Sequence, residues 1–375
     1  EGIVIASKLP TTGSVTQYAV NDILISNIRP YLKKVWFANQ VGGASNDVIV
    51  VRAKDDVLAT YLSFILRNDA FIDYVMKGAK GVKMPRGDIA LIKAYSIAYP
   101  QKQEQQKIAA CLSFLDDLIT TENQQLEALK THKKGLMQSL FPAEGETVPK
   151  FRFPEFKDAG AWEEQTLQEF ALIVRGGSPR PIDEYLTKDI DALNWLKIGD
   201  IDKESKYVTS TEEKVIHSAL TKTRIVNEGD LILSNSMSFG RPYILKIKTC
   251  IHDGWIAVSE IKESMDRDFL YYLMMTSSSQ SYFSNNAAGS GVQNLNAEII
   301  KSLPVSYPQK QEQQKIAACL SSLDDLINAQ SQKIEALKQH KKGLMQQLFP
   351  NVVSKVEITD HFRDATKMVE QERYS

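Results

Sequence analysis

The sequence predicts an α+β protein in which two similar domains are joined by two long antiparallel coiled-coil helices, a pseudo-two-fold internal repeat. Three observations predict it. Tyr99 to Pro142 returns as Tyr307 to Pro350, a shift of 307 − 99 = 208 residues, with 35 of 44 positions identical. Both copies carry a heptad pattern of apolar residues. The segments before the two copies share only scattered matches at the same shift, so the chain keeps its connectors and varies its domains.

The repeat sets the expected domain boundaries. These are a first variable domain at 1–100, a first helix at 101–142, a linker at 143–161, a second variable domain at 162–306, a second helix at 307–350 and a C-terminal tail at 351–375. The first domain has nothing that matches Arg175 to Pro181 or Trp195 to Ile201, and the chain begins at Glu1 rather than Met. We therefore expect the first domain to be incomplete at its N-terminus.

The first domain is predicted to be a diverged copy of the second. Asp22 to Asn27 matches Asp230 to Asn235, and Arg29-Pro-Tyr answers Arg241-Pro-Tyr after a small insertion. Alternating and continuous apolar runs of this length are typical of buried strands.

Each copy of the repeat is predicted to form one long helix. Apolar residues of the first copy step by four and three, and the second copy repeats the steps; in the first copy they are Ile108, Leu112, Leu115, Ile119, Leu126, Leu129, Leu136 and Leu140. Pro100 and Pro142 flank the first copy, as expected at helix boundaries. Such a helix is ~60 Å long and needs a partner for its leucine stripe.

The short linker favours an antiparallel pair, because a parallel pair would need it nearly fully extended. The row of apolar heptad positions along each helix, here called the seam, is interrupted by two polar residues. They are Glu122 and Lys133 in the first copy and Gln330 and Lys341 in the second. A pairing that sets Glu122 against Lys341 and Lys133 against Gln330 avoids a buried unpaired charge. We predict this register.

The second domain reads as strands at Gly229 to Ser236 and Trp255 to Ile261, a helix at Asp266 to Met275, and a short helix followed by a strand within Asn296 to Pro308. Tyr271 and Tyr272 are expected in the core.

The composition excludes several classes of protein. Hydrophobic residues make up 43 % and charged residues 24 % of the chain, as in an ordinary soluble globular protein. No run reaches the ~20 apolar residues of a membrane span. The three cysteines form no CxxC and no zinc spacing, which fits small buried apolar residues with reduced thiols in a cytoplasmic protein. The net charge is −1, so any nucleic-acid surface must be local rather than global.

Several motifs then carry a resemblance. They are GGSPRP, WLKIGDI, GDLILSNS, FLYYLM and GSGVQNLNAEIIKSLPVSYPQKQEQQKIA, and a long heptad helix and the two-fold arrangement accompany them. With these features the chain resembles the specificity subunit of type I restriction–modification enzymes, which serve bacterial defence. The most specific part is P-x-x-x-E-Q-Q-K-I-A, at Pro100 to Ala109 and Pro308 to Ala317. The resemblance implies that each variable domain is a target-recognition domain for one half of a split, bipartite site on double-stranded DNA. It implies that the helices set the spacing and dock two methyltransferase subunits, and that restriction subunits with motor and nuclease activity join the full complex.

Loops rich in basic and polar residues are the candidate DNA contacts, because these side chains read base edges and bind phosphates. In the first domain the candidates are Arg29, Lys33, Lys34, Lys80, Lys83 and Arg86. In the second they are Arg175, Ser178, Arg180, Ser234, Asn235, Arg241, Gln293 and Asn294. Glycine-rich loops are often plain turns and lysine pairs are often solvated surface, and both alternatives stay open here. His252-Asp253 reads as a polar turn between strands rather than an acid–base pair.

The chain carries no P-loop, GxGxxG, HExxH, G-x-S-x-G or amino-methyltransferase motif. We therefore expect no catalytic residues, no metal and no cofactor in this chain, and we expect S-adenosylmethionine on the methyltransferase partners. Two alternatives remain: a coiled-coil scaffold that presents two non-DNA-binding domains, and an enzyme with its site in one variable domain.

Overall fold

The computed structural model describes residues 15–202, 205–235, 239–287, 294–349 and 362–364. The chain divides into two compact units: Glu1–Gln125 with Gln330–Ser375, and Leu126–Ala329. Two long helices, α4 (Lys102–Leu140) and α8 (Lys310–Leu348), contribute residues to both units. Both helices lie where the heptad pattern predicts them.

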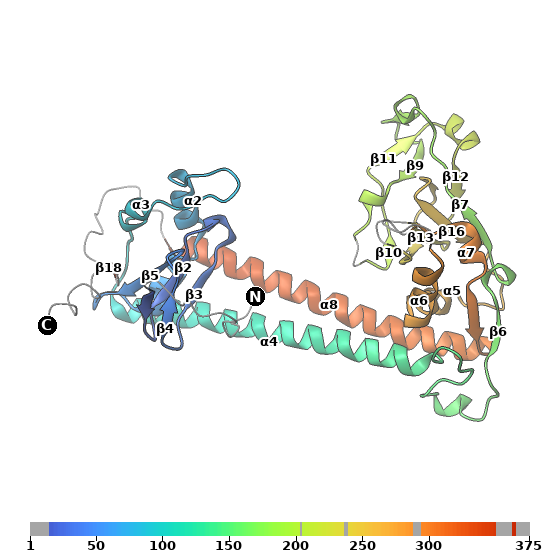
Figure 1. Cartoon of the computed structure of the whole chain (residues 1–375), viewed down its shortest axis with the longest axis horizontal. Helices are drawn as coiled ribbons and strands as arrows, with labels where there is room; N and C mark the ends of the chain where they lie inside the picture. The colour runs from blue at the N-terminus through green and yellow to red at the C-terminus, as the bar shows by residue number, and fades with distance from the viewer. Residues whose placement is uncertain (1–14, 203–204, 236–238, 288–293, 350–361, 365–375) are drawn as a thin grey trace. The chain divides into compact units, whose positions relative to one another are not determined.

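The first unit contains a four-stranded antiparallel sheet in the order β18-β5-β2-β3 and a separate pair β1-β4 (Figure 1). Its strands are β1 (Thr16–Tyr18), β2 (Ile23–Ser26), β3 (Val35–Phe37), β4 (Gly42–Ala44), β5 (Val48–Ala53) and β18 (Phe362–Asp364). Its short helices are α1 (Ala59–Ile65), α2 (Asp69–Lys77) and α3 (Ile89–Lys93), with a 3-10 turn η1 (Pro30–Leu32) after β2. The segment Asp22 to Asn27, which matches a predicted strand of the second domain, contains β2.

The core of the first unit continues into the long helices. Leu62 of α1, Phe71 of α2 and Leu112 of α4 are at most 1 % exposed and belong to one apolar cluster. Phe349, just after α8, joins the same cluster and packs against Tyr61 at a ring distance of 5.3 Å. The heptad leucines near the helix ends are therefore domain core as well as helix seam.

The second unit has two five-stranded sheets, in the orders β10-β14-β13-β16-β7 and β12-β15-β9-β11-β8, and a pair β17-β6. Its strands are β6 (Glu163–Thr166), β7 (Leu172–Arg175), β8 (Leu186–Thr187), β9 (Leu193–Leu196), β10 (Tyr207–Val208), β11 (Glu213–Val215), β12 (Arg224–Val226), β13 (Leu231–Ser234), β14 (Pro242–Leu245), β15 (Thr249–Ile251), β16 (Trp255–Ser259) and β17 (Pro304–Tyr307). Its α-helices are α5 (Arg267–Met275), α6 (Ser277–Asn286) and α7 (Ala297–Lys301), and its 3-10 turns are η2 (Pro154–Phe156), η3 (Leu167–Glu169), η4 (Ile182–Glu184), η5 (Ile198–Asp200) and η6 (His217–Thr221).

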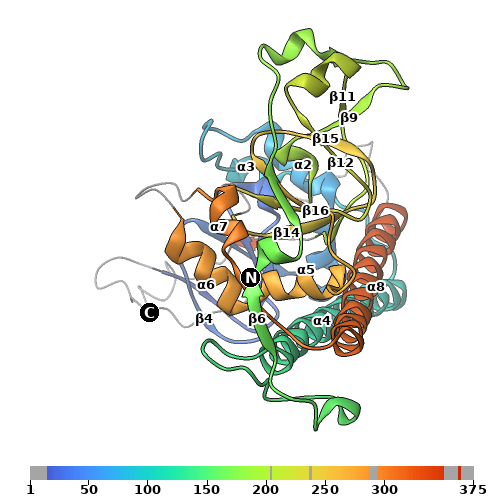
Figure 2. The same ribbon diagram turned by 90° about the vertical axis from the view of Figure 1, so that its right-hand side faces the viewer.

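The first of these sheets is buried on both faces. Leu231 and Leu233 of β13 lie in a cluster with residues of α5, α6 and α7, whereas Ile232 faces a cluster with residues of β9, β12 and β15. Figure 2 shows α5 and α6 beside this sheet. Burial on both faces explains why the strand reads as a continuous apolar run. The strands and helices predicted for this domain are found at β13, β16, α5, α7 and β17, while the second sheet was not predicted.

Tyr271 and Tyr272 are buried, as predicted. Tyr272 donates a hydrogen bond to Asp324 of α8 at 2.5 Å, and the buried Lys206 lies 3.1 Å from the same hydroxyl. Lys206 also forms an ion pair with Asp268 at 2.8 Å, so its charge is neutralised inside the domain. This network fastens the second domain to its part of α8.

The predicted helix register is wrong by about one heptad. Within the first unit, Glu122 accepts hydrogen bonds from Gln330 (2.6 Å) and Lys333 (2.6 Å), not from Lys341. Lys341 instead bonds Asp116. Within the second unit, Lys133 bonds Asp324, not Gln330. Within the first unit the order of the bonded residues is reversed between the two helices, since Asp116 bonds Lys341 and Glu122 bonds Gln330.

The register prediction failed because it required each seam charge to be neutralised in its own layer. Lysine has a long flexible stem, so a lysine in the seam can reach a carboxylate on the flank of the partner helix. Asp116 and Asp324 occupy such flanking positions, and they are the same position of the repeat (116 + 208 = 324).

Candidate nucleic-acid interface

The first unit brings its six predicted residues onto two neighbouring loops. The main-chain N–H of Arg29 donates to the carbonyl of Pro85 at 2.8 Å, and Lys80 and Arg86 exchange main-chain hydrogen bonds at 2.9 Å. Arg29 and Lys33 both have a φ of 52°, which turns the chain sharply around η1. The loop with Arg29, Lys33 and Lys34 therefore lies against the loop with Lys80, Lys83 and Arg86; we call this pair the first-domain loops.

Most cations of the first-domain loops are exposed. Lys80 and Arg86 have exposed side-chain fractions of 87 % and 60 %. Arg86 forms an ion pair with Asp47 at 2.9 Å, and Lys33 pairs with Asp69. Exposed pairs of this kind contribute only ~0–1 kcal/mol, so a DNA phosphate can replace the carboxylate at little cost.

The same loops expose apolar side chains that sequence reasoning missed. Tyr31 and Leu32 are each 48 % exposed, Met84 is 52 % exposed, and Val82 is fully exposed. Architectural DNA-binding proteins insert apolar side chains of this kind between base steps. The available signal was the placement of apolar residues inside lysine-rich loops, whereas the sequence search looked for polar and basic residues only.

In the second unit Asp253 contacts three of the predicted residues, Arg175, Ser178 and Arg180. It lies in the turn between β15 and β16, as the polar-turn interpretation of His252-Asp253 predicted. Its carboxylate accepts from Ser178 Oγ at 2.9 Å and lies 3.3 Å from Arg180, and its carbonyl accepts from Arg175 Nε at 2.9 Å. Arg180 keeps an exposed fraction of 81 %. The turn itself was not recognised as a part of the site.

The pKa of Asp253 lies below its ordinary value. Burial alone raises the pKa, but the hydrogen bond from Ser178 and the charges of His252, Arg175 and Arg180 outweigh burial. The carboxylate is therefore ionised at neutral pH and pairs with Arg180, while the main-chain carbonyl of the same residue holds Arg175.

Two glycines allow this close approach. A Cβ on Gly176 would lie 2.2 Å from the carbonyl oxygen of His252, and one on Gly177 would lie 2.5 Å from that of Lys222. The glycine pair of the GGSPRP motif therefore brings the arginine-bearing loop against two neighbouring backbones.

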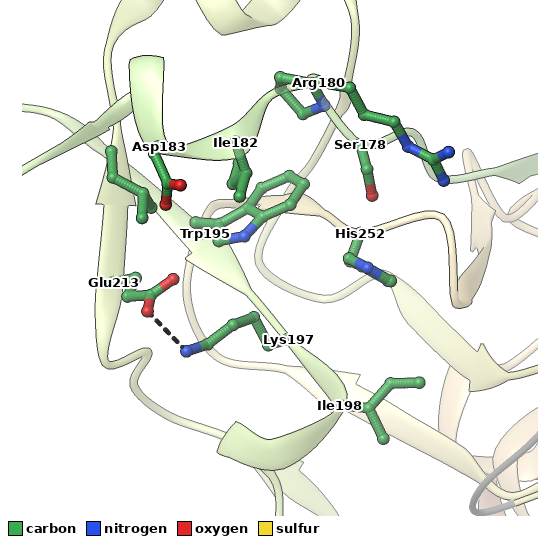
Figure 3. A pocket seen from close by; sticks show the side chains of 11 residues that line it. Ser178, Arg180, Ile182, Asp183, Trp195, Lys197, Ile198, Glu213 and His252 are labelled. Atoms are coloured by element: carbon green, nitrogen blue, oxygen red, sulfur yellow. Dashed lines mark ion pairs between the residues drawn. The ribbon is translucent and has the colours of Figure 1, made fainter.

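A cavity of about 600 Å³ opens beside this cluster (Figure 3). Trp195, which is 1 % exposed, lines it and packs against His252 at a ring distance of 6.0 Å. Lys197 forms an ion pair with Glu213 at 2.8 Å on the cavity wall, which raises the pKa of Lys197. The WLKIGDI motif supplies Trp195 and Lys197. Neither residue is among the predicted DNA contacts.

Two predicted contacts need correction. Ser234 is 0 % and Asn235 6 % exposed, so neither side chain can meet a base in this structure. Asn235 has a structural role: its main chain bonds Gly254 (3.0 Å) and Leu295 (2.9 Å), and its side chain donates to the Asp253 carbonyl at 3.3 Å. The sequence showed polar residues after a strand but not the distant residues, Gly254 and Leu295, that bond the main chain there.

The remaining predicted residues have varied settings. Arg241 is partly buried, with its guanidinium 5.7 Å from the Tyr243 ring, and its Nε has no hydrogen-bond partner among the residues that the structure describes. Asn294 is exposed. Gln293 lies outside the described residues.

Within the described ranges no group of His, Cys, Asp or Glu is arranged to hold a metal ion, and no helix is long and apolar enough to cross a membrane. All three cysteines are free thiols. Cys250 is buried, as expected for a small apolar position, but Cys111 is exposed, so that interpretation is wrong for Cys111.

Comparisons with known proteins agree on one family. A family model described as the type I restriction modification DNA specificity domain matches residues 10–131 and 160–339. The MjaVIII type I restriction enzyme specificity subunit of Methanocaldococcus jannaschii is 24 % identical over 325 residues, 82 % of this chain and 74 % of the relative. The MjaX specificity subunit of the same organism is 28 % identical over 304 residues, 78 % of this chain and 67 % of the relative.

Solved structures show the same fold. A chain from a structure on complex assembly and conformational transition of the type I R-M system superposes with a TM-score of 0.60 at 17 % identity, covering 90 % of this chain and 84 % of that one. The type I restriction-modification S subunit from M. genitalium gives a TM-score of 0.54 at 16 % identity, covering 89 % and 84 %. Because the family model matches most of the sequence, including both variable domains, the chain belongs to the type I restriction–modification DNA specificity family.

Proposed function

We propose that this chain is the DNA sequence-recognition subunit of a type I restriction–modification complex, and that each variable domain reads one half of a split target. The observation that carries the proposal is that two related units present different cation-bearing loops. The first unit offers the first-domain loops, with exposed Lys80 and Arg86. The second offers Arg175 and Arg180 around Asp253. Different loops on one fold suit two different half-sites.

We further propose that α4 and α8 form one antiparallel coiled coil between domains bounded at residues 1–100 and 162–306. The ion pairs Asp116–Lys341 and Lys133–Asp324 support this arrangement, because they are the same pair of repeat positions used once in each unit. The frame would dock two methyltransferase subunits, since two near-identical faces suit two identical partners. These partners would carry the S-adenosylmethionine, and restriction subunits would join them for cleavage in the cytoplasm.

The test is binding of the purified complex to duplex DNA at several salt concentrations. Recognition through phosphates predicts an affinity that falls linearly with salt on logarithmic axes. The matched variants are Arg180→Ala and Lys315→Ala. Arg180 lies at the proposed interface, whereas Lys315 is a surface residue of α8 that pairs with Glu155.

We expect Arg180→Ala to weaken binding and Lys315→Ala to leave it unchanged. Binding that ignores salt, or equal effects of the two variants, would support a scaffold that does not bind DNA. Methyl transfer by the chain alone would instead reveal an enzyme.

A further inference from the structure

A second cavity of about 600 Å³ lies in the second unit, away from the residues assigned to DNA. The second half of α4, the residues that follow it and the first turn of α6 surround it. Its lining combines lysines, apolar side chains and hydroxyls: Lys130, Lys133, Lys134, Lys150, Met137, Phe141, Pro142, Met275, Ser277 and Ser278 among them. We call it the lysine groove.

The lysine groove has more positive charge than the chain neutralises. Lys133 bonds Asp324, and Lys130 lies 3.1 Å from Glu127. Within the described ranges, no ion pair joins Lys134 or Lys150, both exposed, to a carboxylate. The first turn of α6 holds no acidic residue, so its main-chain N–H groups add positive potential.

The first unit shows how the chain treats the corresponding place. By the repeat shift, Lys342 corresponds to Lys134 (134 + 208), and Asp69 at the start of α2 corresponds to Ser277 at the start of α6 (69 + 208). The Asp69 carboxylate lies 4.0 Å from Lys342 and pairs with Lys33. The first unit therefore supplies its own carboxylate to this lysine, whereas the second unit has a hydroxyl there.

We propose that the lysine groove binds an acidic peptide segment of a partner protein, with one carboxylate at the place that Asp69 takes in the first unit. The partly exposed apolar side chains of Met137 and Met275 favour a peptide over a bare phosphate, because they can bury apolar residues beside the acidic ones. The proposal goes beyond DNA reading and does not rest on it, since the groove contains none of the candidate DNA contacts.

The probe is a fluorescein-labelled peptide of eight residues that alternates Asp or Glu with Leu or Phe, titrated with the full chain. We expect saturable binding that weakens with salt. Ser277→Asp should reduce the affinity about tenfold, because it places a carboxylate beside Lys134 as Asp69 does beside Lys342. An acidic residue in the first turn of a helix is favourable, so this variant should fold.

Ser277→Ala is the matched control and should bind like the parent chain. A peptide with Asn and Gln in place of the acids should bind at least about tenfold more weakly. Equal binding of the neutral peptide, or no effect of Ser277→Asp, overturns the proposal. A random-sequence DNA duplex is the second probe. If Ser277→Asp weakens DNA binding, the groove contacts phosphate and the proposal is wrong, whereas the proposed DNA reading stands or falls with Arg180.

Discussion

Single residues explain why one motif is repeated so closely. Gln105 and Gln313 occupy the same position of the two copies, and both are at most 1 % exposed. Gln105 accepts from the Leu58 N–H at 2.8 Å and donates to two carbonyls. Gln313 accepts from the Asp266 N–H at 2.7 Å and likewise donates to two carbonyls. Each glutamine ties the start of a long helix to its domain, because a buried amide needs all these partners.

The glutamate beside this glutamine has a different environment in each copy, and this difference gives the first prediction. Glu312 is buried and forms two 2.7 Å hydrogen bonds with Arg152 from the linker, whereas Glu104, its counterpart, is exposed. Glu312→Ala should lower the free energy of unfolding by about 3 kcal/mol, because it leaves the Arg152 charge buried without its partner. Glu104→Ala should cost less than about 0.5 kcal/mol. Urea unfolding of both variants measures the difference, and equal effects would contradict the assigned role of Arg152.

A second prediction concerns the glycine pair beside Asp253. Gly176→Ala places a methyl group 2.2 Å from a main-chain oxygen, so the loop with Ser178 and Arg180 must move. We expect DNA affinity to fall about tenfold or more, with loss of specificity only in the half-site read by the second domain. Gly199→Ala is the control, since nothing lies within 4 Å of its Cβ position. The result would go against this account if both variants bound alike.

Among the elements, the helix pair shows what the sequence could and could not predict. The heptads place α4 and α8 almost to the residue, because they reflect burial of one helix face. The register depends on which carboxylates the long charged side chains reach, and the heptad pattern of apolar residues carries no information about those contacts. The second sheet of the second unit was missed for a similar reason: β8 has two residues and β11, β12 and β15 have three each, too few for a periodic signal.

The candidate site was predictable in composition but not in geometry. Arg175, Ser178 and Arg180 lie on one glycine-rich loop, as the motif indicates, but their common partner Asp253 was not predicted. The burial of Ser234 and Asn235 was not predictable, because the residues that bond the Asn235 main chain, Gly254 and Leu295, are distant in the sequence.

The polar centre of the frame gives a third prediction. Nine positions differ between the copies (44 − 35), and two of them are 122/330 and 125/333. These two positions supply Glu122 and its partners Gln330 and Lys333, both of which bond the Glu122 carboxylate. Hydrogen bonds from Lys333 and then from Gln330 hold the pKa of Glu122 below its ordinary value of 4.5. A lowered pKa in the folded state means that this stabilisation is present above about pH 4.5 and is lost as pH falls through the folded-state pKa.

Glu122→Gln should therefore flatten the acid limb of the melting-temperature profile and lower the melting temperature at pH 7. Lys333→Gln should do the same to a smaller extent, because Gln330 still donates to Glu122. The two changes combined should cost less than the sum of the single changes, as expected for residues in contact. Additive effects in this double-mutant cycle would count against the contact.

For the molecule as a whole, the contrast between a fixed frame and varied domains gives the last prediction. If α4 and α8 together space two DNA readers, helix length must set the length of DNA between the half-sites. Adding one heptad to each helix, after Gln124 and after Gln332, keeps the heptad phase and lengthens the pair by ~10 Å, or about three base pairs. The variant should prefer a target whose spacer is longer by that amount, with both half-sites unchanged.

Binding to duplexes with spacers varied one base pair at a time, in complex with the methyltransferase subunits, measures this preference. A four-residue insertion is the control: it lengthens the helices by ~6 Å but breaks the heptad phase, so it should destabilise the pair rather than shift the spacer. Because the two domains differ in their loops, we also expect the half-sites to differ in sequence. An unchanged spacer preference, or a target made of identical inverted repeats, would show that the helices do not act as a spacer between two distinct readers.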